Sequence, residues 1–206
     1  MNDSFADRWH DTWRDLRMPV PDAVLPALLA RWAEPHRCYH TLQHLRECLE
    51  LLAAHGALAE RPGEVGIALW FHDAVYDTAR HDNEAASADW ARRVLRGAGA
   101  AAEVTERVDA LILATRHSQV PVTPDERLLV DIDLAILGAA PGRFEEYERQ
   151  IRDEYAFVPE DVFRDRRAGI LRGFLARPAL YCTAALAARF EAPARANLAA
   201  AIARLD

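Results

Sequence analysis

Apolar residues recur at helical spacing along nearly every long segment of this chain of 206 residues. Near the N-terminus, Phe5, Trp9 and Trp13 stand four residues apart, which places them on one face of a helix. No segment alternates between apolar and polar residues as a half-buried strand does, and glycine is sparse. The pattern therefore predicts an all-α fold.

The stretch from Val65 to Val75 is almost wholly apolar, which predicts a buried central helix. No internal repeat or long polar linker divides the chain. We therefore expect one domain over 1–206, a helical bundle in which N-terminal helices (1–35) and C-terminal helices (140–206) pack on a core (36–139). Helices are expected at about 5–16, 23–33, 39–54, 62–77, 83–95, 102–116, 125–137, 144–156, 160–176 and 193–205.

The charge balance limits the partners of this protein. The formal net charge is −7, which argues against polymeric nucleic acid as a partner, because such proteins normally present a basic face. All 25 cationic side chains are arginine, so neither Schiff-base chemistry nor a phosphate-binding lysine is available. Contacts to a phosphate must therefore come from arginine, histidine, backbone N–H groups or a metal ion.

The chain has no feature of a secreted or membrane protein. Its three cysteines, Cys38, Cys48 and Cys182, form no C-x-x-C pair and no even framework for disulfides. The N-terminus has no basic stretch followed by an apolar one, and the longest apolar runs are too short to span a membrane. We expect a cytoplasmic protein without a membrane partner, and the sequence leaves open whether it forms a homo-oligomer.

Histidines and a carboxylate occur in a pattern that suits metal binding. His40 and His44 lie four residues apart in one expected helix, so they share a face and suit two ligands, or one ligand and one acid. His72 and Asp73 end the apolar stretch "ALWFHD", where packing alone does not explain a polar pair. Adjacent helical residues point about 100° apart, so both reach one ion only if it lies between their directions.

Two further carboxylates lie in the apolar segment "LLVDIDLAIL". Asp131 and Asp133 would each be costly to bury unless they are paired or bound to a metal ion. Together with the histidines, they suit a borderline divalent cation that keeps open positions for water. The candidate cofactor is Mn, Mg, Ni, Co, Zn or Fe.

The same residues resemble the H…HD…D pattern of the HD superfamily of metal-dependent phosphohydrolases, whose members bind metal on a bundle of helices. The resemblance covers most of the chain and implies an HD-type fold. It also implies that the metal ligands are His44, His72, Asp73 and Asp133. In that superfamily the ligand aspartate usually precedes a dipeptide of the type Arg-Leu or Leu-Ser. Asp133 is therefore preferred to Asp131, because Leu134-Ala135 follows it. The matching stretches are "RCYHTLQHL", "ALWFHDAVYDTARHDNEAASA", "DIDLAILG", "YERQIRDEY" and "ARANL".

Two branches of that superfamily suggest the catalytic residues. The segment "YHTLQHL" resembles one in cyclic-nucleotide phosphodiesterases, and this implies that His40 protonates the leaving oxygen. The segment "HDAVYDT" resembles one in guanosine tetraphosphate hydrolases, where a Glu-Asp pair positions the attacking water. Here Asp77 matches the aspartate, but Tyr76 replaces the glutamate, which argues against that alarmone as substrate.

The expected activity is hydrolysis of a nucleotide or another small phosphate ester. Arg116, His117, Glu84 and Arg152 are the candidates for contacts to the substrate or for support of a ligand. One alternative is a regulatory module that binds metal without turnover. Another is a di-iron oxygenase of the same fold, which would need His81 and His117 as extra ligands. A third, a helical scaffold, requires that no metal binds.

Overall fold

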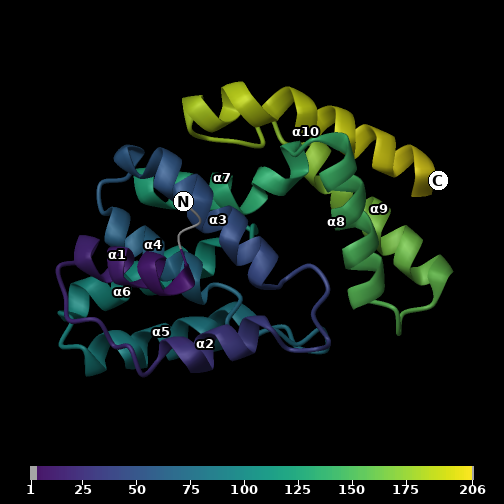
Figure 1. Cartoon of the computed structure of the whole chain (residues 1–206). Coiled ribbons are helices and arrows are strands. Elements are labelled where there is room, and N and C mark those ends of the chain that lie inside the picture. Colours follow the sequence, from purple (N-terminus) through teal and green to yellow (C-terminus); the bar gives the residue numbers. More distant parts are fainter. Residues whose placement is uncertain (1–3, 206) are drawn as a thin grey trace. The chain divides into compact units, whose positions relative to one another are not determined.

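The computed structural model describes residues 4–205, which form helices and connecting turns with no strand among them (Figure 1). The all-α prediction is confirmed. The chain divides into two compact units, residues 1–130 and 131–206, and each is described by itself. The expectation of one domain of the HD type stays a prediction.

Most of the helices belong to the first unit, and the division between the units falls within α7. The first unit contains α1 (Phe5–Asp15), α2 (Leu25–Trp32), α3 (Leu42–His55), the 3-10 helix η1 (Gly56–Leu58), α4 (Pro62–Phe71), α5 (Asn83–Gly97), α6 (Ala102–Ala114) and most of α7 (Pro124–Asp133). The second contains the end of α7, the 3-10 helix η2 (Leu134–Gly138), α8 (Pro141–Glu154), α9 (Glu160–Leu175) and α10 (Ala184–Leu205).

The helix α4 is the buried centre of the first unit. Every residue from Gly63 to Phe71 is buried, and α1, α3, α5 and α6 all pack against this helix. A helix that is apolar on all sides is stable only when other elements cover it. Its one charged residue, Glu64, accepts hydrogen bonds from Arg107 of α6 at 2.6 and 2.7 Å. The predicted buried central helix is thus confirmed, although it ends at Phe71 rather than near Asp77.

Tryptophan side chains fix the last turn of α4. Trp9, Trp13, Trp32 and Trp70 are fully buried, and the rings of Trp9 and Trp70 meet edge to face at 5.2 Å. Trp70 Nε1 donates to Thr12 Oγ1 at 3.1 Å, and Trp32 Nε1 donates to Trp70 O at 3.1 Å. Buried indole N–H groups normally find such partners. These bonds hold the end of α4 against α1 and α2.

The start of α4 approaches the end of α1 so closely that position 63 requires glycine. A Cβ on Gly63 would lie 2.4 Å from Leu16 N and 2.7 Å from the carbonyl carbon of Asp15. We expect Gly63→Ala to lower the free energy of unfolding by about 1–3 kcal/mol in urea denaturation, because backbone must move. Gly97→Ala is the control, since nothing lies within 4 Å of its Cβ. Unchanged stability of Gly63→Ala would contradict this packing.

The helix α3 begins later than expected. Thr41 is its N-cap, with an extended backbone and a side-chain oxygen that accepts a hydrogen bond from Gln43 N at 3.3 Å. A threonine in this conformation starts a helix at the next residue. His40 therefore precedes the helix, and the prediction that His40 and His44 share one helix face is wrong.

The second unit is built around η2 and α10. The helix η2 packs against α8 and α10, and α9 packs against α10. Asp131 accepts hydrogen bonds from Cys182 N, Thr183 N and Thr183 Oγ1 at 2.6 to 3.0 Å. Burial raises the pKa of Asp131, although these hydrogen bonds favour its ionised form. Asp131 thus holds in place the two residues that immediately precede α10.

The start of α10 differs from the expected one. This helix begins at Ala184, nine residues before the expected start at Pro193. Pro193 lies inside the helix, where it supplies no N–H for the helical ladder.

Among the described residues, no helix is both long enough and apolar enough to cross a membrane.

Candidate metal centre

Three side chains of the first unit bring ligand atoms together where α3 meets the end of α4. His44 lies in the first turn of α3, His72 is the C-cap of α4, and Asp73 follows it. His44 Nε2 lies 3.2 Å from His72 Nε2 and 4.0 Å from Asp73 Oδ2. His72 Nε2 lies 3.1 Å from Asp73 Oδ2. Two of its members, His44 and His72, belong to a group of residues whose ligand atoms could hold a metal ion.

The spacing of these three atoms matches the bond lengths of a divalent transition metal. In a triangle with sides of 3.2, 3.1 and 4.0 Å, the point equidistant from the corners lies about 2.0 Å from each. Zinc binds imidazole nitrogen at about 2.0–2.1 Å and carboxylate oxygen at about 2.0–2.2 Å. The three atoms are therefore spaced so that one ion could lie at bonding distance from all of them.

Hydrogen bonds to the far side of each imidazole orient the two histidines. His72 Nδ1 lies 2.9 Å from Leu69 O, and because a carbonyl only accepts, Nδ1 carries the proton. The neutral ring then presents an unprotonated Nε2 to the centre. His44 Nδ1 lies 3.1 Å from the hydroxyl of Tyr39. Partners of this kind hold metal-binding histidines in position in known metal sites.

The centre is largely shielded from water. The side chains of His44 and His72 are 3% and 1% exposed, whereas that of Asp73 is 16% exposed. The ring of Trp32 lies 5.4 Å from that of His72, and Cys48 Sγ lies 3.8 Å from His44 Nε2. Two imidazole nitrogens and a carboxylate so close together can share a cation, either a metal ion or a bound proton.

The proposed acid His40 lies beside this centre. His40 is half-buried, and its ring centroid lies 6.1 Å from that of His44. The ring of Tyr76 stacks on it, with centroids 4.2 Å apart and planes at 27°. Tyr76 stands where the resemblance would place a glutamate, and the structure gives its ring a contact with the imidazole instead.

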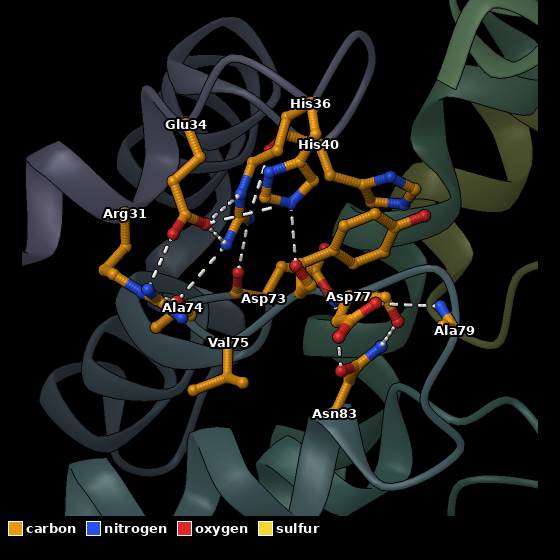
Figure 2. Close-up of polar contacts among 12 residues, drawn as sticks. Arg31, Glu34, His36, His40, Asp73, Ala74, Val75, Asp77, Ala79 and Asn83 are labelled. Atoms are coloured by element: carbon orange, nitrogen blue, oxygen red, sulfur yellow. Dashed lines mark hydrogen bonds and ion pairs between the residues drawn. The ribbon is translucent and has the colours of Figure 1, made fainter. Parts of the chain in front are cut away.

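The expected water-positioning residue Asp77 takes part in an exposed turn. Asp77 Oδ1 accepts a hydrogen bond from Ala79 N at 2.9 Å. The backbone of Asp77 exchanges two hydrogen bonds with the side chain of Asn83 (Figure 2). These contacts are structural, and a role of Asp77 in orienting water stays a prediction.

The expected substrate contacts are distributed over both units. In the first unit, Arg116 Nε lies 3.5 Å from Glu84 Oε2, so the structure brings these two predicted residues together. His117 follows the end of α6 with a φ of 54°. In the second unit, Arg152 donates to Tyr155 O at 2.8 Å and to Val158 O at 3.2 Å. The contacts of Arg152 stabilise the end of α8, and its role toward a substrate stays a prediction.

The remaining expected ligand, Asp133, is the half-buried last residue of α7 and belongs to the second unit. Its role as a ligand stays a prediction. His81, which a di-iron centre would need, is exposed in the turn between α4 and α5. The sequence reasoning assigned no role near His44 to Tyr39 or Cys48, although Cys48 stands one helical turn after it.

Comparison with protein-family models gave no match, and comparisons with curated proteins and with solved structures gave no similar protein.

Proposed function

We propose that this protein is a metal-dependent phosphohydrolase that acts on a nucleotide or another small phosphate ester. The observation that carries the proposal is the triangle formed by His44 Nε2, His72 Nε2 and Asp73 Oδ2. Its size fits one divalent ion, and Leu69 O fixes the tautomer of His72 in the form that binds metal. Two imidazoles and a carboxylate suit Mn, Fe, Co, Ni or Zn.

The proposal includes Asp133 as the fourth ligand. The sequence resemblance supports this choice, and so does the separate use of Asp131, whose carboxylate binds the backbone just before α10. Asp131 and Asp133 lie two residues apart in α7, so they point to different sides of that helix. Because both carboxylate oxygens of Asp131 already accept hydrogen bonds, we propose Asp133 as the ligand.

The roles of the other residues follow from hydrolysis at phosphorus. When bound, a divalent ion lowers the pKa of a coordinated water and offsets the charge on a phosphoryl oxygen. His40 supplies the proton that the leaving oxygen takes as its bond to phosphorus breaks. Asp77 Oδ1 accepts from Ala79 N, so Oδ2 is the oxygen that we propose for orienting the attacking water.

A small substrate agrees with the charge of the chain. The net charge of −7 and the absence of lysine do not favour a nucleic-acid polymer. The exposed side chain of Arg116 is the proposed phosphate contact, held in place by Glu84. Arginine suits phosphate because its planar guanidinium donates two parallel hydrogen bonds.

A regulatory module that binds metal without turnover is the second candidate. Tyr76 replaces the glutamate of the related hydrolases, and its ring is stacked on His40. Asp77 Oδ1 is used by a backbone N–H. Both observations favour binding over catalysis, and they do not affect the three-atom centre.

The test combines metal content with hydrolysis. Protein purified without chelator is expected to carry about one transition-metal ion per chain, as measured by mass spectrometry. It is expected to release phosphate or nucleoside from part of a panel of nucleotides and small phosphate esters. Treatment with chelator is expected to stop this hydrolysis. Metal without hydrolysis across the panel would support the regulatory module. No metal, together with no rise in melting temperature on adding Mn, Ni, Zn or Mg, would leave only a helical scaffold.

A further inference from the structure

We propose that Arg37 is the positioning residue of the metal centre. Its guanidinium holds the segment that carries His40 and the turn that carries Asp73 in one fixed arrangement. The inference rests on the proposed metal site. It concerns the affinity and the geometry of that site, whatever the substrate.

Arg37 donates hydrogen bonds to the backbone of both segments. Nη1 donates to Asp73 O at 2.6 Å and to His40 O at 3.2 Å, and Nη2 donates to Ala74 O at 3.3 Å. Nε and Nη2 also donate to Glu34 Oε2, both at 3.1 Å (Figure 2). One planar group thus joins Glu34 in the segment after α2, the loop before α3 and the turn after α4. The side chain is fully buried, so water does not compete for these bonds.

The turn after α4 depends on such donors because it belongs to no helix or strand. From residue 73 to residue 77, every carbonyl oxygen accepts a hydrogen bond from a side chain, and buried backbone groups are costly when they lack a partner. The donors, in order along the turn, are Arg37, then Arg37 with Arg31, then Ser87, His36 and Asn83. Arg37 donates to the first two of these carbonyls, those of the proposed ligand Asp73 and of Ala74.

Arg37 also contacts the rings that surround the centre. Its Cζ lies 5.6 Å from the centroid of Trp32 and 5.4 Å from that of Tyr76. The ring of Trp32 contacts the ligand His72, and the ring of Tyr76 stacks on His40. Attraction between a cation and an aromatic face is stronger where water is excluded. Through these two rings, Arg37 supports one ligand and the proposed acid in addition to Asp73.

Lysine cannot reproduce these contacts. Arg37 makes five hydrogen bonds from three nitrogens that lie in one plane. Lysine has a single ammonium on a flexible stem, so it cannot hold three backbone oxygens and Glu34 together. The variant Arg37→Lys therefore keeps the buried charge but loses the fixed geometry.

The experiment measures metal binding to folded protein. Chelator-treated wild type, Arg37→Lys and Arg31→Lys are titrated with Mn²⁺ and with Co²⁺ by calorimetry, and the visible absorption bands of bound Co²⁺ report ligand geometry. For Arg37→Lys we expect binding about 10- to 100-fold weaker, the range for residues that orient metal ligands, and a changed Co²⁺ spectrum. Circular dichroism well below the melting temperature confirms that each variant is folded.

Arg31→Lys is the matched control. Arg31 also contacts Glu34, at 2.6 Å, and Ala74 O, at 3.4 Å, but its side chain is 42% exposed and it donates to neither His40 nor Asp73. We expect the metal affinity of Arg31→Lys to stay within about two-fold of that of the wild type, with an unchanged Co²⁺ spectrum. Ion pairs of solvent-exposed side chains such as Arg31 contribute little.

The outcomes separate this inference from the proposed function. Wild-type affinity and spectrum in Arg37→Lys would overturn the inference and leave the proposed function in place. A wild type that binds neither ion would overturn both. If Arg37→Lys does not fold, Glu34→Gln decides, because it keeps Arg37 and removes the carboxylate that orients it. Weaker metal binding in Glu34→Gln supports the inference, and unchanged binding overturns it.

Discussion

Replacement of His72 by alanine is expected to abolish metal binding. His72 Nε2 lies 3.2 and 3.1 Å from the ligand atoms of His44 and Asp73, so it is the corner that the two other ligands share. Loss of a partner that merely orients a ligand weakens metal binding about 10- to 100-fold, and loss of the ligand itself is expected to exceed about 100-fold. Calorimetric titration of chelator-treated protein measures this affinity.

Thermal unfolding gives a second readout of the same change. An ion that binds only folded protein stabilises it by about 2.7 kcal/mol at a concentration 100 times its Kd. We expect this metal-dependent rise in melting temperature in the wild type and not in His72→Ala. His10→Ala is the control, because His10 is a surface residue that pairs with Asp22. A His72→Ala variant that keeps the full metal-dependent rise would show that the ion binds elsewhere.

A local signal marks the start of α1, which agrees with the helix expected from residue 5. Ser4 and Asp7 cap this helix reciprocally. The start of α10 depends instead on Asp131, which is 51 residues before Cys182 in the chain. A contact made from so far away leaves no local pattern, and Pro193 resembles a helix start because proline is common in first turns.

The proximity of three of the proposed ligands was predictable for a different reason. His72 and Asp73 are a polar pair at the end of an apolar segment, and the structure places His44 beside them. Arg37 could not be found in this way, because its partners near the centre are backbone oxygens. Every residue carries a carbonyl, so the pattern of side chains in the sequence does not indicate which carbonyls a buried arginine contacts.

The start of α3 changes how His40 relates to the ligands. In an unbroken helix, His40 would be held on the same face as His44. The extended backbone of Thr41 instead places His40 in the loop, where its contacts include the stacked ring of Tyr76 and the bond from Arg37 to its carbonyl. The imidazole of His40 is thus positioned independently of the helix that carries the ligand His44, which suits a group that handles a proton rather than the metal.

Replacement of His40 by glutamine is expected to lower kcat about 10²- to 10⁴-fold, the usual range for loss of a general acid, with metal content unchanged. The loss should depend on the leaving group. An alkyl or nucleoside alkoxide needs a proton as it departs, whereas a nitrophenolate does not, so the variant should be much less impaired on a nitrophenyl phosphate ester. The high-pH decline of kcat that reports the protonated acid should also disappear in the variant.

His81→Gln is the control, because His81 is an exposed histidine that the proposed hydrolysis does not use. Equal losses on both kinds of ester would mean that His40 positions the substrate or supports the centre and is not the proton donor.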